Sequence, residues 1–229
     1  KEMLETVRQY HQVTKHHVHR FAAGPGHLDW DTQPNPFRRY DGAPLIGLDK
    51  VPPTGEPRYD EAFVEGRHSP VLLNRRSISQ LFFDSLAISA WKSTSGSRWA
   101  LRVNPSSGNL HPTEGYLLCG PVDGLCAVPV VCHYAPKEHA LEVRAKFGLG
   151  LWETLCQQCP PETIFVGFTS VHWREAWKYG QRAYRYCQHD LGHAVAAVAI
   201  AAAGLGWQTR LMDDLGTAEL ARLLGTERK

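Results

Sequence analysis

The stretch that decides the fold runs from residue 102 to residue 118 and reads Arg-Val-Asn-Pro-Ser-Ser-Gly-Asn-Leu-His-Pro-Thr-Glu-Gly-Tyr-Leu-Leu. Its first half is rich in residues that form turns, and its second half is apolar and β-prone. The change between the halves predicts a polar turn at residues 104–112 that leads into a buried strand at residues 115–119. Such a turn presents small polar groups on a stiff frame.

The turn combines prolines that fix φ with a glycine that permits unusual backbone angles, and its other side chains are short hydroxyls and amides. Its central residues are Pro105, Ser106, Ser107, Gly108 and Asn109. These groups suit a planar ligand with carbonyls and ring nitrogens, or a phosphate. The alternative is an ordinary turn that only connects two elements.

Composition narrows the class of protein. The chain has 229 residues, 43% of them hydrophobic and 21% charged, which is typical of one soluble globular domain with an extended arm. The net charge is +2 and the basic residues are scattered, so a nucleic-acid partner has little support. The most apolar segment, residues 194–205, is too short to span a membrane. We therefore expect neither nucleic acid nor membrane as a partner.

The chain has six cysteines, and several lie in apolar, strand-like runs. Buried free thiols favour a reducing compartment, so we expect a cytoplasmic protein. Cys156 and Cys159 have the spacing of a redox or zinc pair, but a second pair is missing. We predict no metal site and keep a zinc or thiol-redox protein as a weaker alternative.

The N-terminal third is organised differently from the rest. Residues 1–17 predict a helix, and residues 21–57 are rich in Pro, Gly and aromatic side chains, which favours an ordered arm that wraps over a neighbouring surface. We therefore divide the chain into a helix and arm at residues 1–70 and a domain at residues 71–229.

A helix is expected to begin near Asn74 or Ser77, because either can cap it and apolar residues follow from Ile78 to Ile88 at helical spacing. Arg75 and Arg76 would then lie at its positive end. Together they form a plausible anion site. The alternative, a basic helix start exposed to solvent, is equally probable from the residues alone.

The remaining pattern predicts strands and helices that alternate. We expect the long helix to be central and buried, because one stripe of it is apolar and its second half is apolar on every face. The predicted elements are strands at residues 128–134 and 163–169, short helices at 140–147 and 151–157, the long helix at 181–204, an extended segment at 207–212 and a final helix at 217–224.

Three separated motifs combine into a recognisable set. They are Arg75-Arg76-Ser77, then Pro105-Ser-Ser-Gly-Asn-Leu-His-Pro-Thr-Glu114, then Trp177-Lys-Tyr-Gly-Gln-Arg-Ala-Tyr-Arg-Tyr186 with Gly192-His193 and Gly204-Leu-Gly206. The set resembles the nitroreductase superfamily of FMN-dependent oxidoreductases, and within it the SagB/ThcOx-type branch that includes azoline oxidases. The resemblance covers roughly residues 71–224.

The resemblance implies an α+β fold in which helices flank a mixed, mainly antiparallel sheet, with FMN at the interface of a dimer formed through the long helix. It assigns the cofactor contacts to Arg75, Arg76, Ser77, Pro105, Ser106, Ser107, Asn109, Gly206 and Arg210. We expect the guanidinium pair near residue 75 and the turn near residue 107 to converge on one flavin.

Lys178 and Tyr179 resemble the Lys-Tyr pair of the azoline-oxidising branch. The resemblance implies hydride transfer between flavin and a heterocyclic or quinone-like substrate, or NAD(P)H, with Lys178 as the base and Tyr179 as an orienting or relaying group. A small molecule or a heterocycle borne on a peptide is the expected substrate. The alternative is a surface pair without a chemical role.

Two departures from the family pattern bear on the function. Ser79 stands where many members have a second basic residue, and the family's closing C-terminal strand is expected to be absent from residues 71–229. The first weakens the expected phosphate site, and the second suggests part of a longer chain. The second functional hypothesis is therefore a catalytically silent half that completes the flavin pocket of a partner, which would be a second copy or a second nitroreductase-like domain.

Overall fold

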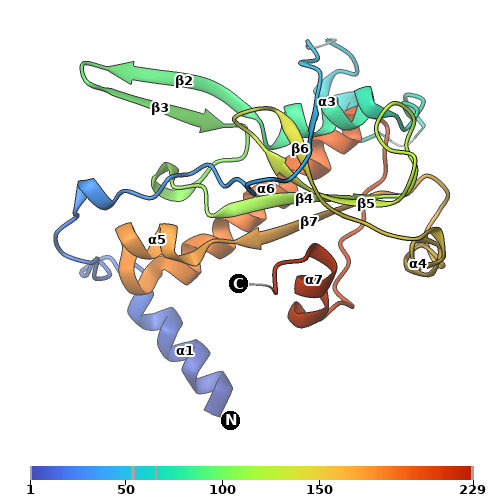
Figure 1. Cartoon of the computed structure of the whole chain (residues 1–229). Coiled ribbons are helices and arrows are strands. Elements are labelled where there is room, and N and C mark those ends of the chain that lie inside the picture. The colour runs from blue at the N-terminus through green and yellow to red at the C-terminus, as the bar shows by residue number, and fades with distance from the viewer. Residues whose placement is uncertain (1, 53–54, 65, 228–229) are drawn as a thin grey trace.

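The computed structural model describes residues 2–52, 55–64 and 66–227, and its centre is a five-stranded sheet (Figure 1). The strands lie in the order β1-β6-β5-β4-β7, and each neighbouring pair is antiparallel. Their bounds are β1 Leu45–Gly47, β4 Thr113–Cys119, β5 Val130–Ala135, β6 Ala140–Lys146 and β7 Phe165–Ser170. The expected sheet with helices around it is present, with wholly antiparallel pairing among the described strands.

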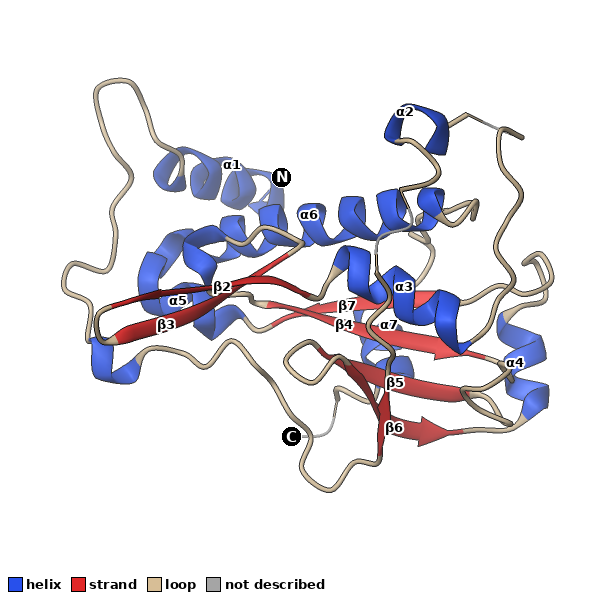
Figure 2. Ribbon diagram, turned by 90° about the horizontal axis from the view of Figure 1, so that it is seen from above, coloured by secondary structure: helices blue, strands red, loops and turns tan. Residues whose placement is uncertain are grey.

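Helices cover the sheet and extend beyond it (Figure 2). The α-helices are α1 Glu2–Thr14, α2 Tyr59–Ala62, α3 Arg75–Ser85, α4 Leu149–Leu155, α5 His172–Tyr179, α6 Ala183–Gly204 and α7 Thr217–Leu224, and short 3-10 turns lie at Trp30–Thr32, Ser107–Asn109 and Gly180–Arg182. None of the described helices is both long and apolar enough to cross a membrane. The bounds of α7 are those predicted from the sequence.

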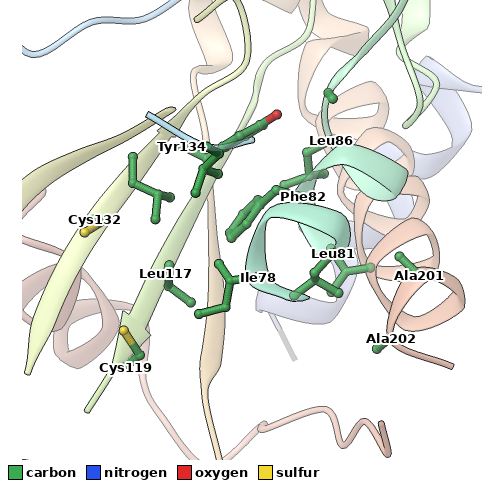
Figure 3. Packing of buried hydrophobic residues seen from close by; sticks show 14 of the residues in the cluster. Ile78, Leu81, Phe82, Leu86, Leu117, Cys119, Cys132, Tyr134, Ala201 and Ala202 are labelled. Carbon is green, nitrogen blue, oxygen red and sulfur yellow. The ribbon is translucent and has the colours of Figure 1, made fainter. Parts of the chain in front are cut away.

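The main core lies between the sheet and the pair α3 and α6 (Figure 3). Strand β4 is buried along its whole length, which explains its continuous apolar run. Leu117 and Cys119 point into the main core, while Tyr116 and Leu118 face a second cluster with Leu224 of α7. This alternation lets the strand predicted at residues 115–119 bind helices on both sides.

Helix α6 is buried on one side only, which corrects the expectation of a central buried helix. Asp190, Ala194 and Val198 are buried on its inner side, whereas Ala196 is exposed and Ile200 keeps 45% of its surface accessible. The prediction failed because a helix that is apolar on every side can pack against other elements on two sides. The described residues of this chain pack against one side of α6 and leave part of the other side exposed.

The arm contributes directly to the sheet. Its short strand β1 pairs with β6, and a backbone hydrogen bond from Val143 to Pro44 continues the contact. The expected wrapping of the arm over a neighbouring surface is therefore observed. The domain boundary near residue 70 stays a prediction.

One predicted helical segment is a strand, and one predicted helix ends earlier than expected. Residues 140–147 form β6, because Leu141 lies on one face of the strand while Glu142 lies on the other, where its charge is paired. Helix α3 ends at Ser85, and Ile88 starts a hairpin that the sequence did not predict: β2 Ile88–Thr94 and β3 Ser97–Arg102 project from the body (Figure 1). The segment at residues 207–212 has no regular structure.

Candidate functional site

Ser106 and Ser107 hold their turn against α6 through one carboxylate, that of Asp190. The Ser106 hydroxyl donates to it at 2.7 Å, and Ser107 donates from its hydroxyl at 3.0 Å and from its backbone N–H at 3.0 and 3.1 Å. Asp190 is only 1% exposed. The two hydroxyls predicted to contact a cofactor are therefore already engaged within the chain.

The rest of the turn is also internally bonded. The Asn109 amide donates to the carbonyl of Ala100 at 2.9 Å, and its oxygen lies 2.8 Å from Nε2 of His111. Burial, with the charges of Arg102 and Arg174, lowers the pKa of His111 to about 2, so the neutral ring donates from Nε2. Pro105 and Gly108 remain exposed at the tip of the turn.

Lys178 and Tyr179, at the end of α5, cover the turn at Gly108. A methyl group at Gly108 would lie 2.7 Å from the Tyr179 hydroxyl, 2.9 Å from Cδ of Lys178 and 3.2 Å from its Nζ. Gly108 also has a φ of +62°, a conformation that favours glycine. The structure thus brings the predicted catalytic pair onto the predicted cofactor-binding turn.

Glu175, one helical turn before this pair, is a site residue that the sequence reasoning missed. Its side chain is fully buried, and neither carboxylate oxygen has a hydrogen-bond partner among the described residues. Burial and the nearby charge of Asp190 raise the pKa of Glu175 to about 8, although Lys178 opposes the shift. The sequence could have indicated Glu175 by its position three residues before Lys178, because residues at this spacing lie on one side of a helix.

Burial also raises the pKa of Tyr179, and the charge of Glu175 adds to the shift. Its ring packs against Tyr186 with centroids 4.3 Å apart, and the Arg182 guanidinium lies 5.3 Å from its centroid. Tyr179 is therefore a phenol that is held in place by its neighbours and keeps its proton.

The Arg-Arg-Ser motif forms the N-terminus of α3. Asn74 caps the helix by accepting from the Ser77 N–H at 3.0 Å, and the Ser77 hydroxyl accepts the Asn74 N–H at 2.9 Å. This capping box engages the Ser77 side chain within the chain. The Arg75 guanidinium donates to the Gly47 carbonyl, its buried Nε has no partner among the described residues, and Arg76 is exposed.

Gly206 and Arg210 lie beyond α6. Gly206 has a φ of +70° and packs against Pro70, whose Cα would be 2.9 Å from an added Cβ. The neighbouring Leu205 carbonyl accepts the Val71 N–H at 2.9 Å. Gly206 thus joins the end of α6 to the segment before α3, and Arg210 is exposed farther along.

The arginine motif and the serine turn lie beyond opposite ends of β4, so the expected convergence of the two motifs within this chain is not observed. The turn precedes β4, whereas the Arg75 N–H bonds the Asp123 carbonyl beyond its other end. The seven residues of β4 span about 20 Å. On α6, Asp190 bonds the serine turn and Leu205 bonds Val71, which precedes the arginine motif. These two residues lie about 22 Å apart along the helix axis. Sequence order alone did not reveal this separation.

A cleft of about 490 Å³ lies beside the start of α3. Its lining includes Leu73, Asp123, Trp152, Cys156 and Cys159. Burial raises the pKa of Cys156. Within the described ranges no three histidine, cysteine or acidic side chains gather as a metal site would require.

A series of charged side chains, most of them buried, links α5 to the sheet. Arg174 donates to Glu114 at 2.6 Å, and His133 lies between Glu114 at 2.9 Å and Glu142 at 2.7 Å. Arg39 of the arm completes the series by donating to Glu142 at 2.7 Å. Both ring nitrogens of His133 therefore face carboxylates, and the ring links the two acids.

Burial alone would raise the pKa of Glu114, but the hydrogen bond with His133 and the charges of Arg174 and Arg102 outweigh it and lower the pKa. The pKa of Glu142 is lowered in the same way, since the hydrogen bonds from Arg39 and His133 outweigh its burial. Both carboxylates are therefore ionised, and the network fixes the helix that carries Glu175 and Lys178.

Solved structures resemble the chain over most of its length. A candidate nitroreductase of Anabaena variabilis superposes with a TM-score of 0.72 and 25% identity over 95% of this chain and 42% of its own. A candidate nitroreductase of Ralstonia eutropha superposes with a TM-score of 0.56 and 14% identity, over 84% of this chain and 87% of its own. A chain of the E. coli microcin synthetase McbBCD complex with truncated pro-MccB17 bound superposes with a TM-score of 0.54 and 18% identity, over 98% of this chain and 87% of its own. The chain has a nitroreductase-like fold.

No protein-family model and no curated protein matches the sequence. The structural likeness nevertheless supports the nitroreductase superfamily, and it confirms the predicted fold class. The chain spans less than half the length of the Anabaena protein.

Proposed function

We propose that the chain forms part of an FMN-dependent oxidoreductase of the SagB/ThcOx type. The observation that carries the proposal is the cover that Lys178 and Tyr179 form over Gly108, because it joins the two most specific motifs at one place. Bound FMN would supply hydride transfer, and the protein would supply orientation and protons.

The start of α3 fits the phosphate of such a cofactor. Arg75 and Arg76 lie at a helix N-terminus, and Nε of Arg75 is a buried donor without a partner among the described residues. The turn fits less completely, because the hydroxyls of Ser106 and Ser107 already bond Asp190. It offers the exposed edge at Pro105 and Gly108 instead.

We place the flavin between this chain and a second nitroreductase-like unit. Since the two motifs lie about 20 Å apart along β4, the arginines of one unit and the turn of the other would hold one cofactor. The partly exposed apolar side of α6, with Ala196 and Ile200, gives this unit a surface to pack on. The second unit is another copy or a further domain of a longer chain.

The residues over the turn suit proton transfer at a bound substrate. Nζ of Lys178 reaches the space at Gly108 and can take a proton from a ring nitrogen or return it. The Tyr179 hydroxyl orients the same group as a donor. A heterocycle, free or borne on a peptide, or a quinone-like compound is the proposed substrate, and NAD(P)H is a candidate electron partner.

One observation favours the alternative of a silent half that completes a partner's pocket. Asp190 engages the turn hydroxyls and the Asn74 cap engages Ser77, so three predicted cofactor contacts are already satisfied. A protein that stays colourless with FMN alone, and that binds a single FMN per complex once its partner unit is added, would support this alternative.

Flavin retention tests the phosphate site. Arg76→Ala should weaken FMN binding about tenfold or more, because a charge-assisted hydrogen bond contributes roughly 1.5–3 kcal/mol. Arg8→Ala, an exposed arginine of α1, is the matched control. Fluorescence titration with FMN measures both, and equal affinities would show that the phosphate binds elsewhere.

Turnover tests the lysine. Lys178→Ala should keep its flavin and lose about a hundredfold in turnover, the usual contribution of a general acid or base. Lys92→Ala on the exposed hairpin is the control. Unchanged turnover in Lys178→Ala would remove the proton-transfer role while leaving flavin binding intact.

A further inference from the structure

The carboxyl groups of Glu175 and Asp190 form an unequal pair between α5 and α6. Asp190 accepts hydrogen bonds from the hydroxyls of Ser106 and Ser107 and from the backbone N–H of Ser107. Glu175 is equally buried and accepts none from the described residues. Two buried carboxylates close enough to affect each other do not both ionise readily. The hydrogen bonds keep the charge on Asp190, so the proton belongs to Glu175.

We propose that Glu175 is a proton store behind the Lys178–Tyr179 pair: its carboxyl group holds one proton, with Asp190 as the ionised partner, and exchanges that proton with Nζ of Lys178. Glu175 touches neither substrate nor cofactor in this scheme, so it is a positioning residue. The exchange part of the inference rests on the proposed function, whereas the protonation of Glu175 does not.

The surroundings of Glu175 are consistent with this role. Lys178 and Tyr179 follow it by three and four residues on α5, and the charge of Asp190 on α6 adds to the burial that raises its pKa. Glu175 in turn adds to the burial that raises the pKa of Cys187 on α6. The raised pKa of Glu175, about 8, agrees with a proton held at neutral pH. The acid is shielded from solvent while the Lys178 amine reaches the open turn.

The step is a proton transfer without electron movement. When Lys178 has given a proton to the substrate, the O–H bond of Glu175 breaks and an N–H bond forms at Nζ. The products are a carboxylate and an ammonium group, which attract each other inside the protein. In the oxidative direction the same proton returns from Nζ to the carboxylate.

Infrared difference spectroscopy tests the stored proton directly and needs no turnover. The full-length protein should show the carbonyl band of a buried carboxylic acid at neutral pH, and this band should fade as the pH passes about 8. Glu175→Gln should lack the band, and Glu5→Gln, on the exposed side of α1, should keep it. Identical spectra for wild type and Glu175→Gln would overturn the proposal.

Lys178→Met provides a second measurement in a protein with Glu175 intact. Because Lys178 lowers the pKa of Glu175, its removal should move the fading of the band to higher pH. A band that fades at the same pH in both proteins would show that the two groups do not interact, and would overturn the exchange.

Turnover separates this inference from the proposed function. In a protein that binds FMN, Glu175→Gln should lower turnover about tenfold, which is less than the full effect of losing a general acid. It should also flatten the alkaline limb of the pH–turnover profile. An unchanged pH profile would overturn the exchange. A protein without FMN that retains the band would refute the proposed function and support the stored proton.

Discussion

Arg174 and Glu175 are neighbours on α5, yet they lie in opposite electrostatic surroundings. Arg174 belongs to a buried series in which each charge meets an opposite charge, through Glu114 and His133 to Glu142. Glu175 turns toward α6, where its neighbour Asp190 is another acid and no described donor reaches it.

This difference in surroundings distinguishes residues that stabilise the fold from a residue that can change its protonation. A fully paired network holds its geometry and has no reason to change its protons, whereas an unpaired buried acid changes its charge with small changes nearby. The paired network anchors α5 to the sheet and arm, and the unpaired acid lies one helical turn before Lys178. The two regions should therefore respond to mutation and to pH in opposite ways.

The largest expected effect comes from breaking the paired network. Glu114→Gln should lower the free energy of unfolding by about 3–5 kcal/mol, because it leaves Arg174 and His133 buried without their shared carboxylate. Urea unfolding measures the change. The same substitution at Glu227, which pairs with Arg222 at the surface, should cost less than about 1 kcal/mol. Equal losses in the two variants would contradict the comparison.

Acid should weaken the same network. The pKa values of Glu114 and Glu142 are lowered from 4.5 in the folded protein, so both acids bind protons more readily when unfolded. Their contribution to stability is fully present above about pH 4.5 and is lost as the pH falls through their folded values. Unfolding curves at successive acidic pH values should show this loss, and Glu114→Gln should show a shallower one.

The sequence was most informative where a local pattern determined the result. The turn at residues 104–112 and the strand after it were predicted because proline, glycine and apolar runs act locally. Asn74 and Ser77, each considered as a cap, share one capping box. Helix α7 followed from its apolar spacing alone.

Other features depend on contacts between distant residues. Strand β6 was mistaken for a helix because Glu142 looks like a solvent-facing charge until Arg39 and His133 are seen beside it. The role of Glu175 depends on Asp190, which reaches it only when α5 packs on α6. The separation of the two cofactor motifs depends on the direction of β4, which periodicity does not report.

The unpaired acid should change stability with pH in the opposite direction. The pKa of Glu175 is raised from 4.5 to about 8, so the folded protein keeps a proton that the unfolded chain releases. Between these values stability should fall as the pH rises, opposite to the effect of Glu114.

Glu175→Gln removes this proton but keeps the shape of the side chain. It should match wild type near pH 4.5 and become more stable than wild type by several kcal/mol above pH 8, because a pKa raised from 4.5 to about 8 corresponds to at most roughly 5 kcal/mol. Thermal unfolding across this range, with Glu5→Gln as control, measures the divergence. If wild type and Glu175→Gln stay parallel from acid to base, Glu175 has the same charge in both states. It would then be a paired acid like Glu114, and the contrast within α5 would disappear.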